Sequence, residues 1–88
     1  MVGFLLNSFS SMEIKEKVIQ LVAECLEIPI ENLSLETDMD DVEEWDSMRN
    51  VMILSRLEEE FDTMIPEDDI FDLVTIGAIV EEIKKIKG

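Results

Sequence analysis

Apolar residues recur along the chain at the three- and four-residue spacing of amphipathic helices, in three separate stretches. The first covers residues 12–27, and at its start Ser10 and Glu13 have the spacing of a capping box. Its apolar positions are Ile14, Val18, Leu21, Val22, Cys25 and Leu26. Pro29 has no backbone N–H to donate, so the helix cannot continue through it. The pattern predicts an amphipathic helix that ends near Glu27.

The second stretch, from Ser47 to about Glu60, has apolar residues on two faces. One face consists of Ile53, Leu54, Leu57 and Phe61, and the other of Met48, Val51, Met52 and Ser55. A surface helix of a small domain needs one apolar face to pack on the core. We therefore expect the second face to be exposed and available for contacts with other molecules.

A third helix is predicted from about Thr75 to Ile86. Its apolar positions are Ile76, Ile79, Val80, Ile83 and Ile86. Thr75 is a suitable N-terminal cap, and three lysines near the other end complement the helix dipole. Gly77 is expected to weaken the first turn by about 1 kcal/mol relative to alanine.

Two connections join these helices. In the longer one, residues 28–46, four apolar residues are expected to hold the chain over the core because such long loops are uncommon in small domains. They are Leu33, Leu35, Val42 and Trp45. Residues 67–73 could form a short helical turn in which Ile70 and Leu73 pack inward. No strand pattern of useful length and no internal repeat is present. The fold class is therefore all-α, a four-helix bundle with three long helices and one short helix.

With 88 residues, the chain forms one small domain, which we assign to residues 12–88. Residues 1–11 are interpreted as an N-terminal extension, for which the sequence allows disorder. They lack a basic segment and a sufficiently long apolar segment for export, so a cytoplasmic location is expected. Cys25 has no second cysteine with which to pair and is expected to be a small core residue.

The chain has 22 acidic and 7 basic residues, a formal net charge of -15. Nucleic acids and anionic membranes would be repelled by such a surface, whereas basic protein partners would be attracted. We expect no nucleic-acid binding, no membrane insertion and a monomer.

Enzymatic functions are disfavoured by the residues available. The chain has no histidine, and it has neither a nucleophile-elbow motif nor a phosphate-binding P-loop. A calcium loop beginning at Asp38 would require glycine where Glu43 stands and glutamate where Arg49 stands, so no specific metal site is expected. Ser47 or Asp46 could simply cap the second helix. The same helix start would also favour a phosphate group attached to Ser47.

Three segments resemble the acyl carrier protein family: WDSM at Trp45–Met48, LEEEFDTMIP at Leu57–Pro66, and TIGAIVEEIKK, which begins at Thr75. The resemblance covers about residues 12–87. It implies a four-helix bundle of acyl-carrier type, with phosphopantetheine from coenzyme A attached to Ser47. It also implies that a separate transferase attaches this arm, that Asp46 helps to position the transferase, and that the protein is not itself an enzyme.

Further implications of the resemblance concern cargo and partners. The arm would carry acyl groups as thioesters to acyl-loading and acyl-processing enzymes of fatty-acid, lipid or polyketide-type synthesis. The residues expected to dock partners are Met48, Arg49, Val51, Met52, Ser55 and Arg56. Housekeeping carriers have acidic residues where Arg49 and Met52 stand, which favours a specialised member. Alternatively, Arg56 could only pair with Glu60 along the helix. An aminoacyl or peptidyl carrier and an unmodified interaction module remain alternative functions.

Overall fold

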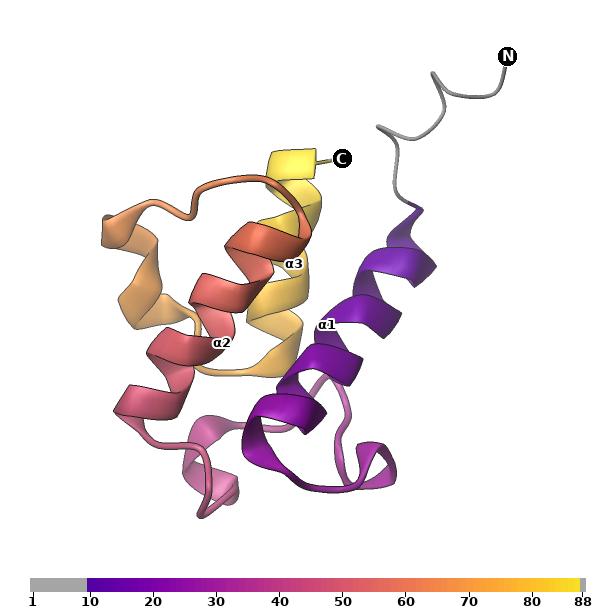
Figure 1. Ribbon diagram of the computed structural model, residues 1–88, viewed down its shortest axis with the longest axis vertical. Coiled ribbons are helices and arrows are strands. Elements are labelled where there is room, and N and C mark those ends of the chain that lie inside the picture. The colour runs from indigo at the N-terminus through magenta and orange to yellow at the C-terminus, as the bar shows by residue number, and fades with distance from the viewer. Residues whose placement is uncertain (1–9, 88) are drawn as a thin grey trace.

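Three α-helices and three short 3₁₀-helices make up residues 10–87, the part of the chain that the computed structural model describes (Figure 1). The elements are, in chain order, α1 (Ser11–Leu26), η2 (Ile30–Asn32), η3 (Met39–Asp41), α2 (Ser47–Glu60), η4 (Glu67–Asp72) and α3 (Ile76–Lys87). Helix α1 packs against both α2 and α3. The described residues contain no strand beyond one isolated β-bridge, so the predicted bundle of three long helices and one short helix is confirmed. Residues 1–9 of the predicted extension lie outside the described residues.

Helix α1 begins with the predicted capping box. The Ser10 hydroxyl accepts a hydrogen bond from the Glu13 N–H, and the Glu13 carboxylate accepts one from the Ser10 N–H. The hydrogen bond from the Ser10 N–H is the main reason that the pKa of the Glu13 carboxyl lies below its ordinary value, and the Ser10 hydroxyl lowers this pKa further. The helix ends at Glu27, whose φ of 58° is left-handed, two residues before Pro29. Cys25 is buried in the core, as predicted.

Helix α2 has the two faces that the sequence predicts. Its inward face and the residue that follows the helix are buried: Ile53, Leu54, Leu57 and Phe61. On its outward face Met48 is 75% exposed, Val51 61% and Met52 46%, and Ser55 is also exposed. We call Met48, Val51, Met52 and Ser55 the outward face of α2.

The long connection between α1 and α2 is pinned to the core at only some of the predicted positions. Leu33 and Trp45 are buried and Val42 is half-buried, whereas Leu35 is exposed. The two 3₁₀-helices in this connection, η2 and η3, were not predicted. Beyond them, the connection pairs with the segment before α3: the Met39 N–H donates to the Val74 carbonyl at 2.8 Å.

Backbone groups of this connection also complete the start of α3. The N–H of Ile76 donates to the Thr37 carbonyl at 3.1 Å, and that of Gly77 donates to the Leu35 carbonyl at 2.9 Å. The Thr75 hydroxyl accepts from the third N–H of the helix, which confirms Thr75 as the cap. The loop thus satisfies two amides that a helix start leaves without partners. Gly77 has a structural role here that its low helix propensity does not reveal.

Substituting alanine for Gly77 is expected to destabilise the protein, although alanine is the better helix former. A Cβ atom at this position would lie 2.9 Å from the Leu35 carbonyl oxygen, a backbone atom that cannot rotate away. Crowding of this kind costs about 1–3 kcal/mol, whereas the gain in helix propensity is about 1 kcal/mol. We expect Gly77→Ala to lower the free energy of unfolding by up to about 2 kcal/mol in urea denaturation. A more stable variant would show instead that the loop yields easily.

Salt is expected to stabilise the fold, because acidic residues are crowded in the short helices. Asp40 and Asp41 lie in η3, while Glu67, Asp68 and Asp69 lie together in η4. Added salt shortens the range of their repulsion to about 10 Å at 0.1 M, and divalent cations screen it further. The melting temperature should therefore rise by several degrees with NaCl and with millimolar Mg²⁺. A melting temperature independent of both salts would contradict this expectation.

Candidate functional site

Helix α2 begins with an aspartate cap followed by an exposed serine. Asp46 Oδ1 accepts a hydrogen bond from the Arg49 N–H at 2.8 Å, and the Asp46 carbonyl accepts from the Asn50 N–H at 2.9 Å. Of the two residues that the sequence offered as caps, Asp46 therefore fills this role. Ser47 is the first residue of the helix, and its side chain is not needed to cap it.

The polar groups of Ser47 remain available. Within residues 10–87, neither the Ser47 hydroxyl nor the backbone N–H groups of Ser47 and Met48 have a hydrogen-bond partner. An exposed hydroxyl beside two such N–H groups fits a phosphate ester, because the positive end of the helix dipole favours the phosphate charge. The Asp46 carboxylate is an adjacent negative charge, but it is directed to the Arg49 N–H.

A buried hydrogen-bonded chain fixes the position of this helix start. Trp45, only 2% exposed, donates from Nε1 to Asn50 Oδ1 at 3.0 Å. Asn50 Nδ2 in turn donates to the Leu73 carbonyl at 3.3 Å. The chain links the residue two positions before Ser47 to the first turn of α2 and to the segment that precedes α3. Its low exposure to water should make it resistant to local opening.

Asn50 was not among the site residues predicted from the sequence, although a signal was present. It lies three, four and seven residues before Ile53, Leu54 and Leu57, on the buried face of α2. A polar side chain among such positions requires a partner in the core. Its amide can donate and accept at once, which is what Trp45 and Leu73 require.

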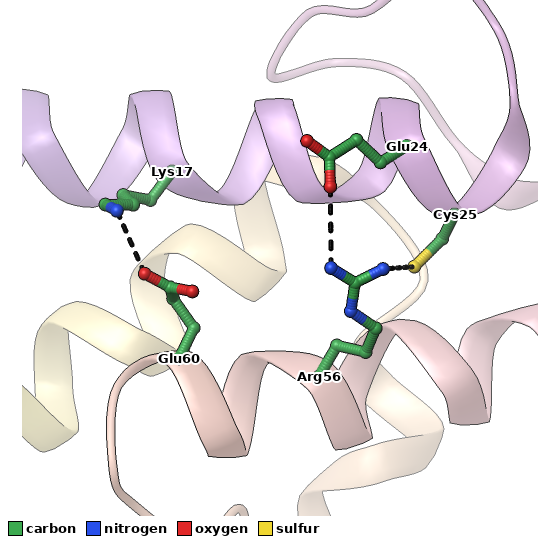
Figure 2. Close-up of polar contacts among 5 residues, drawn as sticks. All are labelled: Lys17, Glu24, Cys25, Arg56 and Glu60. Carbon is green, nitrogen blue, oxygen red and sulfur yellow. Dashed lines mark hydrogen bonds and ion pairs between the residues drawn. The ribbon is translucent and has the colours of Figure 1, made fainter.

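The two arginines of α2 are turned toward α1. Arg49 Nη1 donates to the carbonyl of Cys25 at 2.6 Å, close to the C-terminal end of α1. Arg56 Nη2 lies 3.4 Å from Glu24 Oε1, and Arg56 Nη1 lies 3.9 Å from the Cys25 sulfur (Figure 2). Helix α1 has no basic residue in its last turn, so these arginines provide the positive charge that a helix C-terminus favours.

The alternative in which Arg56 pairs with Glu60 within α2 is not the arrangement in the structure, where Arg56 pairs with Glu24. Glu60 instead binds Lys17 of α1 at 2.9 Å and raises the pKa of Lys17, as Figure 2 shows beside the Arg56 contacts. Because α1 and α2 run antiparallel, the later part of α1 faces the middle of α2, and the earlier part faces its end. This arrangement places Glu24 beside Arg56 and Lys17 beside Glu60.

The surface that follows Ser47 along α2 is apolar and lacks acidic residues. The exposed side chains of Met48 and Val51 lie within the first turns of the same helix, and no acidic residue occurs between Ser47 and Leu57.

Within residues 10–87, no three aspartate, glutamate or cysteine side chains are grouped so that they could hold a metal ion. Among the same residues, every helix is too short or too polar to cross a bilayer.

A protein-family model described as a phosphopantetheine attachment site matches residues 16–83, well over half of the chain. The match begins in the second turn of α1 and ends in α3, so it includes Ser47 and all the elements that position it. The chain therefore belongs to the family of phosphopantetheine carrier proteins: it is not an enzyme, and it holds phosphopantetheine as a covalent group that a transferase installs.

Proposed function

We propose that this protein carries acyl groups as thioesters on a phosphopantetheine arm attached to Ser47. The observation that carries the proposal is the exposed, uncommitted hydroxyl of Ser47 at the first residue of α2. Once attached, the arm supplies a terminal thiol that forms thioesters with the cargo. Ser47 provides the point of attachment, and the buried Trp45–Asn50 hydrogen bond provides a fixed position for it.

Attachment requires one substitution at phosphorus. Ser47 Oγ forms a bond to the phosphorus that bears the pantetheine group in coenzyme A. The bond from this phosphorus to the nucleotide portion breaks, adenosine 3′,5′-bisphosphate leaves, and the hydroxyl proton passes to a base in the transferase. The chain has no histidine to act as that base, and none is required of it. We propose that Asp46 helps to position the transferase, in addition to capping α2.

Partner enzymes are proposed to dock on the outward face of α2, which begins one residue after Ser47. Arg49 and Arg56 lie at its edge toward α1, where Cys25 and Glu24 engage their guanidinium groups. The lack of acidic residues over three turns of α2 supports a specialised carrier of fatty-acid, lipid or polyketide-type synthesis. A cytoplasmic location is part of the same proposal and rests on the sequence alone.

The test is the intact mass of the protein purified from its source, before and after hydroxylamine treatment, which cleaves thioesters. We expect the mass of the chain plus the arm and an acyl group, and the loss of only the acyl group with hydroxylamine. A cargo with the mass and free amine of an amino acid would support an aminoacyl or peptidyl carrier instead. A chain without any added mass, and without uptake from coenzyme A and a transferase, would indicate an unmodified interaction module.

A further inference from the structure

Phe71 is the most exposed of the large apolar side chains in the described residues, at 87%. It belongs to η4, in which Ile70 packs against the core, and the following Leu73 is buried. The fold therefore turns Ile70 and Leu73 inward and leaves an aromatic ring in water. An exposed phenylalanine contributes nothing to core packing, whereas aromatic side chains often anchor protein interfaces.

The segment that contains Phe71 is joined to the first turn of α2, the turn that begins with Ser47. The hydrogen bond from Asn50 to the Leu73 carbonyl fixes the end of η4 beside the first turn of α2. In Figure 1 the short orange segment before α3 lies alongside α2. Val51, 61% exposed, follows Asn50, and Phe71 precedes Leu73 by two residues. We refer to Met48, Val51, Met52 and Phe71 as the apolar docking surface.

Both charged residues that flank Phe71 most closely without an ion pair are acidic, while Lys85 of α3 lies 3.9 Å from Asp69 on the other side of η4. Asp68 and Asp72 are exposed in η4 on either side of Phe71 in the sequence. The two arginines of α2 do not offset them, because both are held against the end of α1. A complementary partner would therefore have an apolar recess with lysine or arginine residues at one edge.

We propose that Phe71 anchors the phosphopantetheinyl transferase, by inserting into an apolar recess of that enzyme flanked by basic residues. This inference rests on the proposed attachment at Ser47. Enzymes that process cargo act on the far end of the arm, so contact with the outward face of α2 is sufficient for them and contact with Phe71 is not required. The transferase has to reach Ser47 Oγ itself, so it must cover the surface next to that atom. Within the apolar docking surface, Phe71 is the part specific to this first encounter, whereas Met48, Val51 and Met52 also belong to the outward face of α2 on which the other partners are proposed to dock.

The experiment compares Phe71→Ser with Met64→Ser in arm transfer from coenzyme A by the transferase of the source organism. Met64 is a matched control, because it is 80% exposed and follows the end of α2 opposite to Ser47, about 20 Å along the helix. We expect Phe71→Ser to lower kcat/KM about tenfold or more through KM, with kcat and the melting temperature unchanged. Met64→Ser should behave as the unsubstituted protein does, and Phe71→Leu should recover much of the loss.

A second variant tests the charged edge. Asp68→Asn/Asp72→Asn should raise KM and weaken its dependence on salt, because it removes the charges expected to meet the basic edge. The inference would be overturned if Phe71→Ser had the same kcat/KM as the unsubstituted protein, or if Met64→Ser impaired arm transfer as much as Phe71→Ser. Either result would leave the attachment at Ser47 standing. Failure of the unsubstituted protein to accept an arm at Ser47 would instead overturn the proposed function.

Discussion

Ser47→Ala is expected to abolish uptake of the phosphopantetheine arm while leaving the fold intact. The substitution removes the only atom of this residue that could form the phosphate ester. It leaves the cap of α2 in place, because Asp46 and not Ser47 accepts the hydrogen bond from the Arg49 N–H. Alanine is also a good helix former, so the free energy of unfolding should change by less than about 0.5 kcal/mol. Incubation with coenzyme A and the transferase, followed by intact-mass measurement, should detect no added mass.

Ser55→Ala provides the matched control. Ser55 is exposed on the same helix and the same outward face, but it lies in the helix interior, where the N–H groups are used in the helix. This variant should still take up the arm, because loss of one hydroxyl leaves the exposed apolar residues of the outward face in place. If Ser47→Ala still gained the mass of the arm, or if only Ser55→Ala failed to gain it, the attachment site would be a hydroxyl other than that of Ser47. Circular dichroism of both variants would establish that neither result comes from unfolding.

The helices could be predicted from the sequence because their stability depends on local patterns. Apolar spacing locates α1, α2 and α3, and local hydrogen-bonding residues such as Ser10 and Thr75 locate two of their starts. The division of α2 into an inward and an outward face also follows from spacing alone. The position of Ser47 at the start of a helix is predictable for the same reason, because the apolar spacing of α2 begins directly after it.

Contacts between distant segments could not be predicted in this way. The partners of Arg49 and Arg56 depend on which part of α1 lies beside them, and the sequence pattern does not specify this. An Arg49→Asp substitution would consequently remove a hydrogen bond to Cys25 as well as change a surface charge. The sequence likewise indicated only that Gly77 weakens the first turn of α3. The close approach of the Leu35 carbonyl could not be predicted, because it depends on the path of a loop.

The position of Phe71 could be predicted only in part: its exposure follows from a local pattern, whereas its location beside α2 depends on a contact between distant segments. Ile70 and Leu73 are three residues apart, and in a 3₁₀-helix such residues lie on the same side. Once both were expected to pack inward, the position of Phe71 away from them followed from the geometry of the turn. Its position beside the first turn of α2 did not, because this depends on the hydrogen bond between Asn50 and Leu73.

Asn50→Ala is expected to cause the largest loss of stability of any single substitution proposed for this protein. It would leave the buried indole N–H of Trp45 and the carbonyl of Leu73 without the partner that each has in the structure. Unsatisfied buried groups cost about 1–3 kcal/mol each, and the cavity adds to this, so we expect a loss of at least about 2 kcal/mol. A domain of this size is stable by only about 5 kcal/mol, so a substantial fraction would unfold on mild warming.

Trp45 is the only tryptophan in the chain, so its fluorescence reports directly on this site during urea denaturation. Asn32→Ala, which alters an exposed asparagine in η2, is the matched control and should have little effect. Trp45→Phe removes both the donor that Asn50 satisfies and the fluorophore, so circular dichroism follows the unfolding of these variants. The double variant Trp45→Phe/Asn50→Leu should lose less stability than the sum of its two single variants. Strict additivity would mean that Asn50 stabilises α2 independently of Trp45. In that case the loop before Ser47 would be held by the packing of the indole ring alone, and arm uptake should withstand the loss of the Asn50 amide.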